Sequence, residues 1–167
     1  DCTLRDGGYY NNWDFSVPLI NEYLKAMRQA NIDIVEIGFR FLNNFDYRGP
    51  CAFSTDDFIK SLKIPKNLVI AVMLNASDLY NEIGWEKVLE KLFPEKAKNT
   101  PVKLVRIACH YDEIQNAFYA CRWLKEKGFK VGINLMQISE RKKNEIIYFS
   151  ELAKKYKPEV IYFADSM

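Results

Sequence analysis

An arginine followed directly by an aspartate stands near the start of the chain, within Thr3-Leu4-Arg5-Asp6-Gly7. A carboxylate binds hard divalent cations and a guanidinium stabilises negative charge on oxygen, so the pair suits a chelated carbonyl substrate. The alternative is a purely structural ion pair between Arg5 and Asp6, beneath a Gly-Gly turn. Glu36 lies within an apolar run, where an unpaired carboxylate is costly. We therefore expect Glu36 to have a partner, and Arg5 is the obvious candidate.

Further polar residues lie within or directly after other apolar runs, near the points where the loops that carry catalytic groups begin in a parallel α/β protein. These residues are Arg40, Arg106, His110, Gln137, Asp165 and Ser166. For Arg106, pairing with a neighbouring carboxylate is the alternative to substrate contact. For His110, a hydrogen-bonded place in a loop is the alternative to a role in the reaction. Asn134 and Gln137 are expected to line a pocket, and Asp165 and Ser166 either bind substrate or cap a loop.

The elements that must position these residues follow from the hydrophobic pattern. Short β-branched runs alternate with amphipathic stretches of helical period, and the unit recurs about every 30 to 35 residues. This predicts strands over residues 2–5, 34–39, 68–74, 103–108, 130–136 and 160–164. Most are apolar throughout, as parallel strands buried on both faces are. Ser54-Thr55-Asp56-Asp57 predicts the start of a helix and Lys125-Glu126-Lys127-Gly128 the end of one.

Strands with helices between them fit either an open doubly wound sheet or most of an eight-stranded barrel. Asp6-Gly7-Gly8-Tyr9-Tyr10 follows the first strand, where a dinucleotide-binding fold has Gly-x-Gly-x-x-Gly, and the sequence lacks the Gly-Lys-Ser/Thr of a P-loop. A complete (β/α)₈ barrel takes ~250 residues. The chain of 167 residues stops within its sixth unit, so we expect a truncated barrel.

Composition excludes several classes of protein. The chain is 49% hydrophobic, which allows one domain with a sizeable core, and its net charge of +2 indicates no nucleic-acid or acidic-membrane partner. The apolar run 69–74 is far shorter than the roughly 20 residues of a membrane helix, and we expect no signal peptide and a soluble, cytoplasmic protein. The four cysteines form no Cys-x-x-Cys pair, so reduced thiols are expected, with Cys121 in the core.

Four motifs together resemble the DRE-TIM metallolyases, the superfamily of hydroxymethylglutaryl-CoA lyase, isopropylmalate synthase and 4-hydroxy-2-oxovalerate aldolase. Residues 1–8, Asp-Cys-Thr-Leu-Arg-Asp-Gly-Gly, resemble the opening strand of the superfamily. Residues 106–113, 131–136 and 162–166 resemble the fourth, fifth and sixth strands of the 4-hydroxy-2-oxovalerate aldolases. The resemblance implies one domain over residues 1–167, holding about the first six βα units of an HMG-CoA lyase-like TIM (β/α)₈ barrel.

The resemblance also implies a metal-dependent aldolase that cleaves a 4-hydroxy-2-oxo acid to pyruvate and an aldehyde, with Mn²⁺ or Mg²⁺ on the 2-oxo acid group. Asp6 would bind the metal, Arg5 would stabilise the enolate, and Glu36 would hold Arg5 in place. The remaining expected site residues are Tyr9 and His110 for catalysis, and Arg106, Gln137 and Ser166 for substrate binding. A homo-oligomer and an aldehyde dehydrogenase partner are further expectations.

Two features depart from the family pattern. The family takes two more metal ligands from a His-x-His on strand seven, and His110 is the single histidine of this sequence. Where the aldolases place a catalytic histidine, this chain has Tyr9 or Tyr10. Tyrosine, with an unperturbed pKa of about 10, is a weaker base near neutrality. Tyr9, Tyr10 and Trp13 either cover the pocket or pack onto adjacent helices.

Three alternatives stay open. A Schiff-base aldolase needs a lysine at the barrel centre or mouth, whereas Lys103 and Lys130 lie at strand starts. An acyl-CoA lyase or Claisen-type acyltransferase of the same superfamily would use the same Arg5, Asp6 and Glu36. A non-catalytic barrel homologue or fragment would act by binding alone. The edge of the sheet after the sixth strand predicts self-association of the isolated chain.

Overall fold

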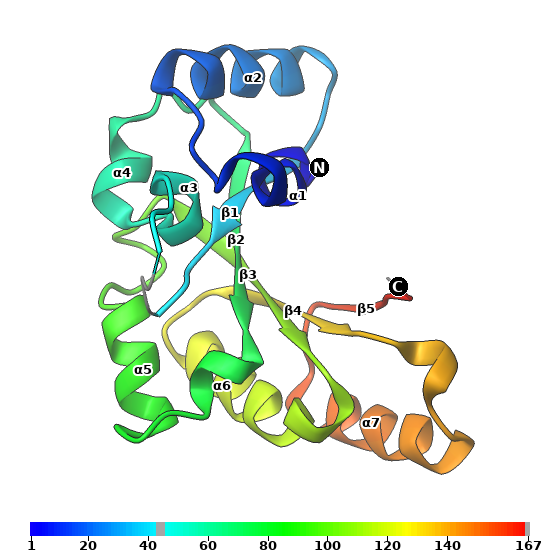
Figure 1. The fold of residues 1–167 in the computed structure, drawn as a ribbon. Helices are drawn as coiled ribbons and strands as arrows, with labels where there is room; N and C mark the ends of the chain where they lie inside the picture. Colours follow the sequence, from blue (N-terminus) through cyan, green and yellow to red (C-terminus); the bar gives the residue numbers. More distant parts are fainter. Residues whose placement is uncertain (43–45, 166–167) are drawn as a thin grey trace.

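The computed structural model describes residues 1–42 and 46–165, which form one parallel β-sheet with helices packed against it (Figure 1). The strands lie side by side in chain order, each parallel to the next. They are β1 (Ile34–Phe39), β2 (Val69–Asn75), β3 (Val102–Cys109), β4 (Lys130–Leu135) and β5 (Val160–Phe163). An α/β fold with a parallel sheet is therefore confirmed, while the described residues form an open sheet and not a closed barrel.

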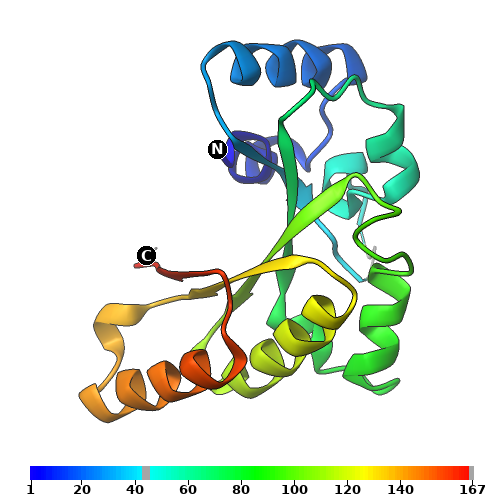
Figure 2. The ribbon, with the colours of Figure 1, turned by 180° about the vertical axis from the view of Figure 1, so that it is seen from behind.

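Two helices precede β1, and the helices after it connect the strands and cover one face of the sheet. The helices are α1 (Thr3–Asn11), α2 (Val17–Gln29), α3 (Pro50–Phe53), α4 (Asp56–Ser61), α5 (Trp85–Leu92), α6 (Ile114–Glu126) and α7 (Lys143–Tyr156), with single turns η1 (Ala76–Leu79), η2 (Tyr111–Glu113) and η3 (Ile138–Glu140). In Figure 1, α3 to α7 wrap around the left and lower sides of the sheet. Figure 2 shows from behind that both termini lie on the opposite, open side.

The strands form because their residues alternate between these two environments. Val35, Ile37, Val105 and Ile133 face the helices and are fully buried. Their neighbours along each strand face the open side, where Arg106 and Asn134 stand among apolar side chains such as Met73. Consecutive strands that lie side by side and parallel are joined by crossovers of the same hand. The connecting helices therefore lie on the same face of the sheet. The open face is left free to carry polar chemistry.

The predicted first strand, residues 2–5, is wrong. Only Asp1 pairs with β1: its ammonium donates to the Ile34 carbonyl at 2.7 Å, and its carbonyl accepts from the Glu36 N–H at 2.9 Å. The Asp1 carboxylate then accepts the Thr3 N–H at 2.8 Å. A carboxylate on a free N–H of the first turn stabilises a helix start. The chain therefore leaves the sheet at once and becomes α1.

The other predicted strands are confirmed to within one residue at each end, and β1 matches its predicted range. The helix starts and ends read from the sequence are also confirmed. Thr55 caps α4 by accepting the Phe58 N–H, and Gly128, with φ of 88°, follows the end of α6. Cys121 is fully buried, as predicted. Among the described residues, no helix is long and apolar enough to cross a membrane.

Candidate active site on the open face of the sheet

A cavity of about 710 Å³ opens on the uncovered face, towards the carboxyl ends of the strands. Six of the residues singled out in the sequence line it: Arg5, Asp6, Tyr9, Arg106, His110 and Asn134. They come from α1, from β3, from the loop after β3 and from β4. In parallel α/β proteins this end of the sheet carries the reacting groups. The sequence-predicted residues are thus largely brought together.

Glu36 lies on β1 beside this cavity and holds two arginines with one oxygen atom. Its Oε1 accepts from Arg5 Nε at 2.7 Å and from Arg106 Nη2 at 2.8 Å. Glu36 is 4% exposed, so a partner of opposite charge is needed to offset the cost of removing it from water. The expected pairing of Glu36 with Arg5 is confirmed. The pairing alternative for Arg106 is also confirmed, although Arg106 lines the cavity as well.

Arg5 makes a second ion pair, from Nη1 to Asp6 Oδ1 at 2.7 Å. Burial alone lowers the pKa of Arg5, but the charges of Glu36 and Asp6 outweigh burial and raise the pKa above its ordinary value. The guanidinium therefore keeps its charge at every pH at which the protein folds. A fixed positive charge at the wall of a cavity can stabilise an oxyanion.

Asp6 is the more exposed partner, with 57% of its side chain accessible. Its Oδ1 faces Arg5, and its Oδ2 accepts from the Cys2 thiol at 3.2 Å. Within residues 1–42 and 46–165, no three His, Cys, Asp or Glu side chains gather closely enough to hold a metal ion. Asp6 can offer one carboxylate ligand, and the described residues alone do not complete a metal site.

The predicted acid–base residues occupy opposite sides of the cavity. Tyr9 lies on α1, is 63% exposed, and packs edge-on to Trp13 with ring centroids 4.9 Å apart. Tyr10 is 95% exposed and does not line the cavity. His110 is half-buried where β3 ends, and its backbone N–H donates to the Glu113 carboxylate at 2.9 Å. Both Tyr9 and His110 are within the cavity lining and are available to a bound molecule.

The substrate-binding predictions at the ends of β4 and β5 are less well placed. Gln137 does not line the cavity, because Asn134 and Met136 occupy the cavity-facing positions and Gln137 turns away with φ of 54°. Asp165 accepts from the Ser139 hydroxyl at 2.7 Å, which matches the loop-capping alternative. Ser166 lies outside the described residues.

One row of residues in the cavity wall, on three neighbouring strands, was not predicted as a set from the sequence. Asn75, Ala108 and Asn134 are paired in register across β2, β3 and β4, so two amides flank a small side chain in one row of the cavity wall. Asn134 was a candidate for pocket lining, whereas Asn75 was not singled out. The alternation of side chains along β2 could have indicated Asn75, but its place beside Ala108 depends on strand register.

Arg40 was expected at the same mouth as Glu36, and the structure shows otherwise. The register of β1 shifts between Glu36 and Phe39, which leaves Arg40 on the helix-covered side. At Gly38 a Cβ atom would lie 1.8 Å from the Cys51 carbonyl oxygen, so only glycine allows α3 to approach β1 at this point. The close approach and the register shift together remove Arg40 from the site.

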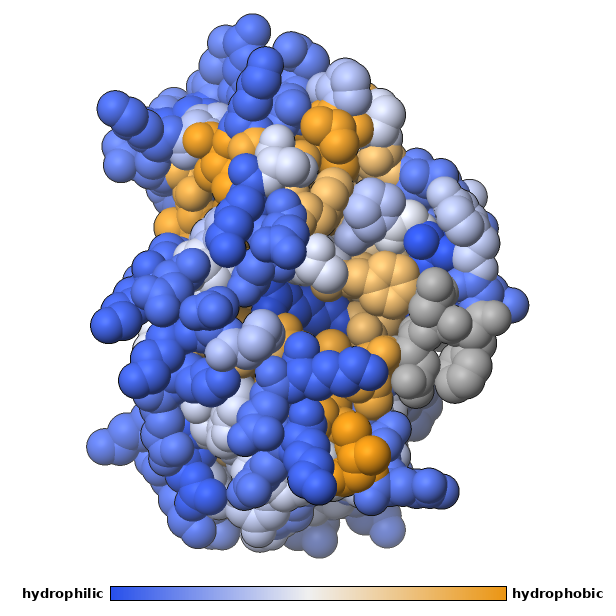
Figure 3. Space-filling view, turned by 90° about the vertical axis from the view of Figure 1, so that its left-hand side faces the viewer, coloured by the Kyte–Doolittle hydropathy of each residue, from blue (hydrophilic) through white to orange (hydrophobic). Residues whose placement is uncertain are grey.

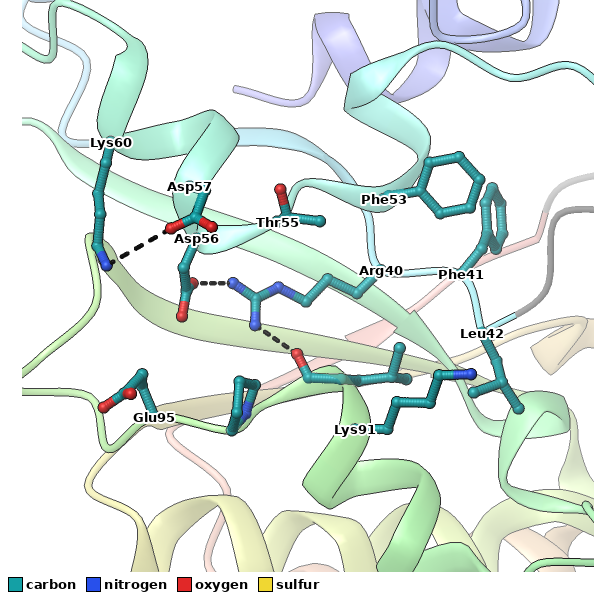
Figure 4. Close-up of a pocket in the computed structure, with 12 residues that line it drawn as sticks. Arg40, Phe41, Leu42, Phe53, Thr55, Asp56, Asp57, Lys60, Lys91 and Glu95 are labelled. Carbon is teal, nitrogen blue, oxygen red and sulfur yellow. Dashed lines mark hydrogen bonds and ion pairs between the residues drawn. The ribbon is translucent and has the colours of Figure 1, made fainter.

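Arg40 instead anchors helices beside a second cavity of about 500 Å³, between α4 and α5 (Figures 3 and 4). Its guanidinium pairs with Asp56 and donates to the carbonyls of Leu92, at 2.6 Å, and Ser54, at 3.2 Å. Burial lowers the pKa of Arg40 in spite of Asp56. Each nitrogen of the guanidinium makes one of these bonds, so Arg40 serves the fold as well as lining the cavity.

No family model matches the sequence, and no curated protein matches it. Among solved structures, the chain is similar to one from Bacteroides vulgatus, described as the "N-terminal domain of a putative aldolase". The TM-score is 0.69 at 25% sequence identity, and the match covers 99% of this chain and 71% of that chain. The likeness shows an aldolase-like α/β fold, with no finer assignment of activity.

Proposed function

We propose that the chain carries part of the active site of a carbon–carbon lyase, an aldolase that cleaves a 4-hydroxy-2-oxo acid to pyruvate and an aldehyde. The observation that carries the proposal is Glu36, which fixes Arg5 and Arg106 by one carboxylate oxygen at the wall of the cavity. The two guanidiniums are balanced by the carboxylates of Glu36 and Asp6 and offer an anionic substrate N–H donors held in a fixed orientation. The likeness to the Bacteroides vulgatus structure adds support.

In the proposed reaction, a base takes the proton of the C4 hydroxyl, the C3–C4 bond breaks, and the aldehyde leaves. The electron pair of that bond moves to the 2-oxo group and gives the enolate of pyruvate, which takes a proton at C3 to form pyruvate. Arg5 stabilises the enolate oxygen, because its charge is fixed and its orientation is held by Glu36. Tyr9 and His110 are the candidate proton carriers.

A divalent cation, Mn²⁺ or Mg²⁺, belongs to the proposal through the sequence resemblance. Bound to the 2-oxo acid group, it would polarise the carbonyl. Asp6 supplies one suitable ligand, and a complete site would need ligands from outside the described residues. The roles assigned above to Arg5, Glu36, Tyr9 and His110 do not depend on it.

The test is pyruvate release from 4-hydroxy-2-oxo acids by the full-length protein, with Mn²⁺ or Mg²⁺ added. We expect Arg5→Lys to lower kcat by roughly 100-fold, as the loss of an oxyanion-stabilising group does. Arg122→Lys is the matched control, because the Arg122 side chain is 59% exposed on α6 and away from the cavity. Cleavage of an acyl-CoA with no release of pyruvate would reassign the protein to the acyl-CoA lyases. Absence of both activities would leave a non-catalytic homologue.

A further inference from the structure

The helix that carries Arg5 and Asp6 is a poor helix by its own sequence. α1 has nine residues, two of which are Gly7 and Gly8. Glycine lowers helix stability relative to alanine, and helices this short are marginal in isolation. Something outside the helix must therefore hold Arg5 where it meets Glu36. The contacts of Trp13 supply that support.

Trp13 reaches back over α1 and bonds the backbone of Arg5. Its indole Nε1–H donates to the Arg5 carbonyl oxygen at 2.9 Å, and the residue is 6% exposed. The ring packs edge-on against Phe39, with centroids 5.6 Å apart, and against Phe41 at 5.3 Å. Phe39 belongs to β1, the strand of Glu36. Trp13 thus links the backbone of Arg5 to the strand that carries its partner.

The place of the indole ring depends on Gly8. A Cβ atom on Gly8 would lie 1.9 Å from Cδ1 of Trp13, inside the ring contact, so no other residue type leaves room for the ring. Gly7, one residue earlier, is different. A Cβ there would meet only Phe15, at an ordinary distance of 3.6 Å. The two adjacent glycines of α1 therefore form a matched pair for experiment.

We propose that Trp13 is a positioning residue for Arg5, and that Gly8 is required because it leaves space for the indole ring. The inference rests on the proposed function, in which Arg5 stabilises the enolate, and extends it to two residues that do not line the cavity. Trp13 acts on the reaction through the Arg5 backbone. This role resolves the two alternatives for Trp13 in favour of packing over pocket cover.

The test compares Trp13→Phe and Gly8→Ala in the full-length protein, with Trp85→Phe and Gly7→Ala as controls. Trp13→Phe keeps an aromatic ring but removes the N–H donor, and Gly8→Ala displaces the ring. We expect both variants to lower kcat by roughly 10- to 100-fold, since small misplacements of a catalytic group have effects of this size, with KM changed much less. The two controls should keep wild-type kcat.

A second readout does not depend on activity. The Nε–H resonance of Arg5, observed by NMR, reports its bond to Glu36. We expect it to move towards the position of a solvent-exposed arginine in Trp13→Phe and Gly8→Ala. The Arg40 Nε–H, bonded to the Ser54 carbonyl on the other side of the sheet, should stay fixed and serves as the reference in the same spectrum.

The outcomes separate this inference from the proposed function. If the Arg5 resonance shifts in the variants while the wild-type protein cleaves no 2-oxo acid, Trp13 remains a positioning residue and the proposed function is overturned. Wild-type kcat and an unshifted Arg5 resonance in both variants would overturn the inference. If Trp13→Phe does not fold, the comparison of Gly8→Ala with Gly7→Ala tests the inference, because alanine at position 7 meets no close contact.

Discussion

Glu36 is a single buried carboxylate that forms ion pairs with two guanidinium groups. Each ion pair requires the arginine that makes it to stay in position. Arg5 and Arg106 are themselves only 13% and 15% exposed. A buried charge that loses its partner costs far more than an exposed one, because water cannot replace the lost contact. The pairing could be predicted from the sequence for this reason: a carboxylate within an apolar strand must find a cation.

Glu36→Gln tests this dependence. The substitution keeps the shape of the side chain and removes its charge, so Arg106 loses its carboxylate and Arg5 keeps only Asp6. We expect the free energy of unfolding, measured in urea, to fall by about 3 kcal/mol. Glu126→Gln on α6 is the matched control, since the Arg122–Glu126 pair is solvent-exposed and should contribute less than about 0.5 kcal/mol. Equal stabilities for the two variants would contradict the assignment.

At the level of elements, the sequence pattern identified β1 to β5, because each strand is a short and mainly apolar run. It failed at α1. Cys2, Thr3 and Leu4 resemble strand residues, but the helix is decided by the Asp1 carboxylate at its start and by Trp13 packed on Gly8. The hydrophobic pattern does not show that these residues lie close together. The row of Asn75, Ala108 and Asn134 escaped prediction for a related reason, since register is a property of paired strands.

Arg40 shows how one side chain can join two elements. It bonds Asp56 at the start of α4 and the carbonyl of Leu92 at the end of α5. Arg40→Met should leave two carbonyls without their donor, and the Asp56 carboxylate with the Thr100 hydroxyl but no cation. We expect a loss of about 3 kcal/mol in the free energy of unfolding. The folded variant should keep wild-type lyase activity, because Arg40 lies on the opposite side of the sheet from the cavity.

The double variant Arg40→Met with Asp56→Leu provides the check on this assignment. It removes the carboxylate that has lost its cation and places apolar groups where the charges were, so part of the lost stability should return. Chemical denaturation of the single and double variants gives the comparison. If the double variant is less stable than Arg40→Met by the full cost of a second independent substitution, the two residues do not act as a pair.

For the molecule as a whole, buried thiols on the covered side of the sheet make the free energy of unfolding depend on pH. Burial raises the pKa of Cys51, Cys109 and Cys121 from 9.0 to about 12. Between these values the native protein retains protons that the unfolded chain releases. The contribution to stability is therefore complete below pH 9 and is lost as the pH rises towards 12, by up to about 1.4 kcal/mol per pH unit for each thiol.

Urea denaturation at several pH values between 8 and 11 measures this loss. We expect the free energy of unfolding to be level up to about pH 9 and to fall above it, with a shallower fall in Cys121→Ala than in the wild type. A variant whose slope above pH 9 equals that of the wild type would show that Cys121 does not retain its proton in the folded state.

The bonds of Glu36 join residues that are far apart along the chain: 31 positions separate it from Arg5 and 70 from Arg106. Contacts of such long range form only after the intervening strands have docked, since each closes a large loop. Arg106 reaches Glu36 across β2, so three neighbouring strands must be in register first. The arginine-lined wall of the cavity is therefore absent from partly folded chains, and the Glu36 network is a marker for completed folding of the β1–β3 region.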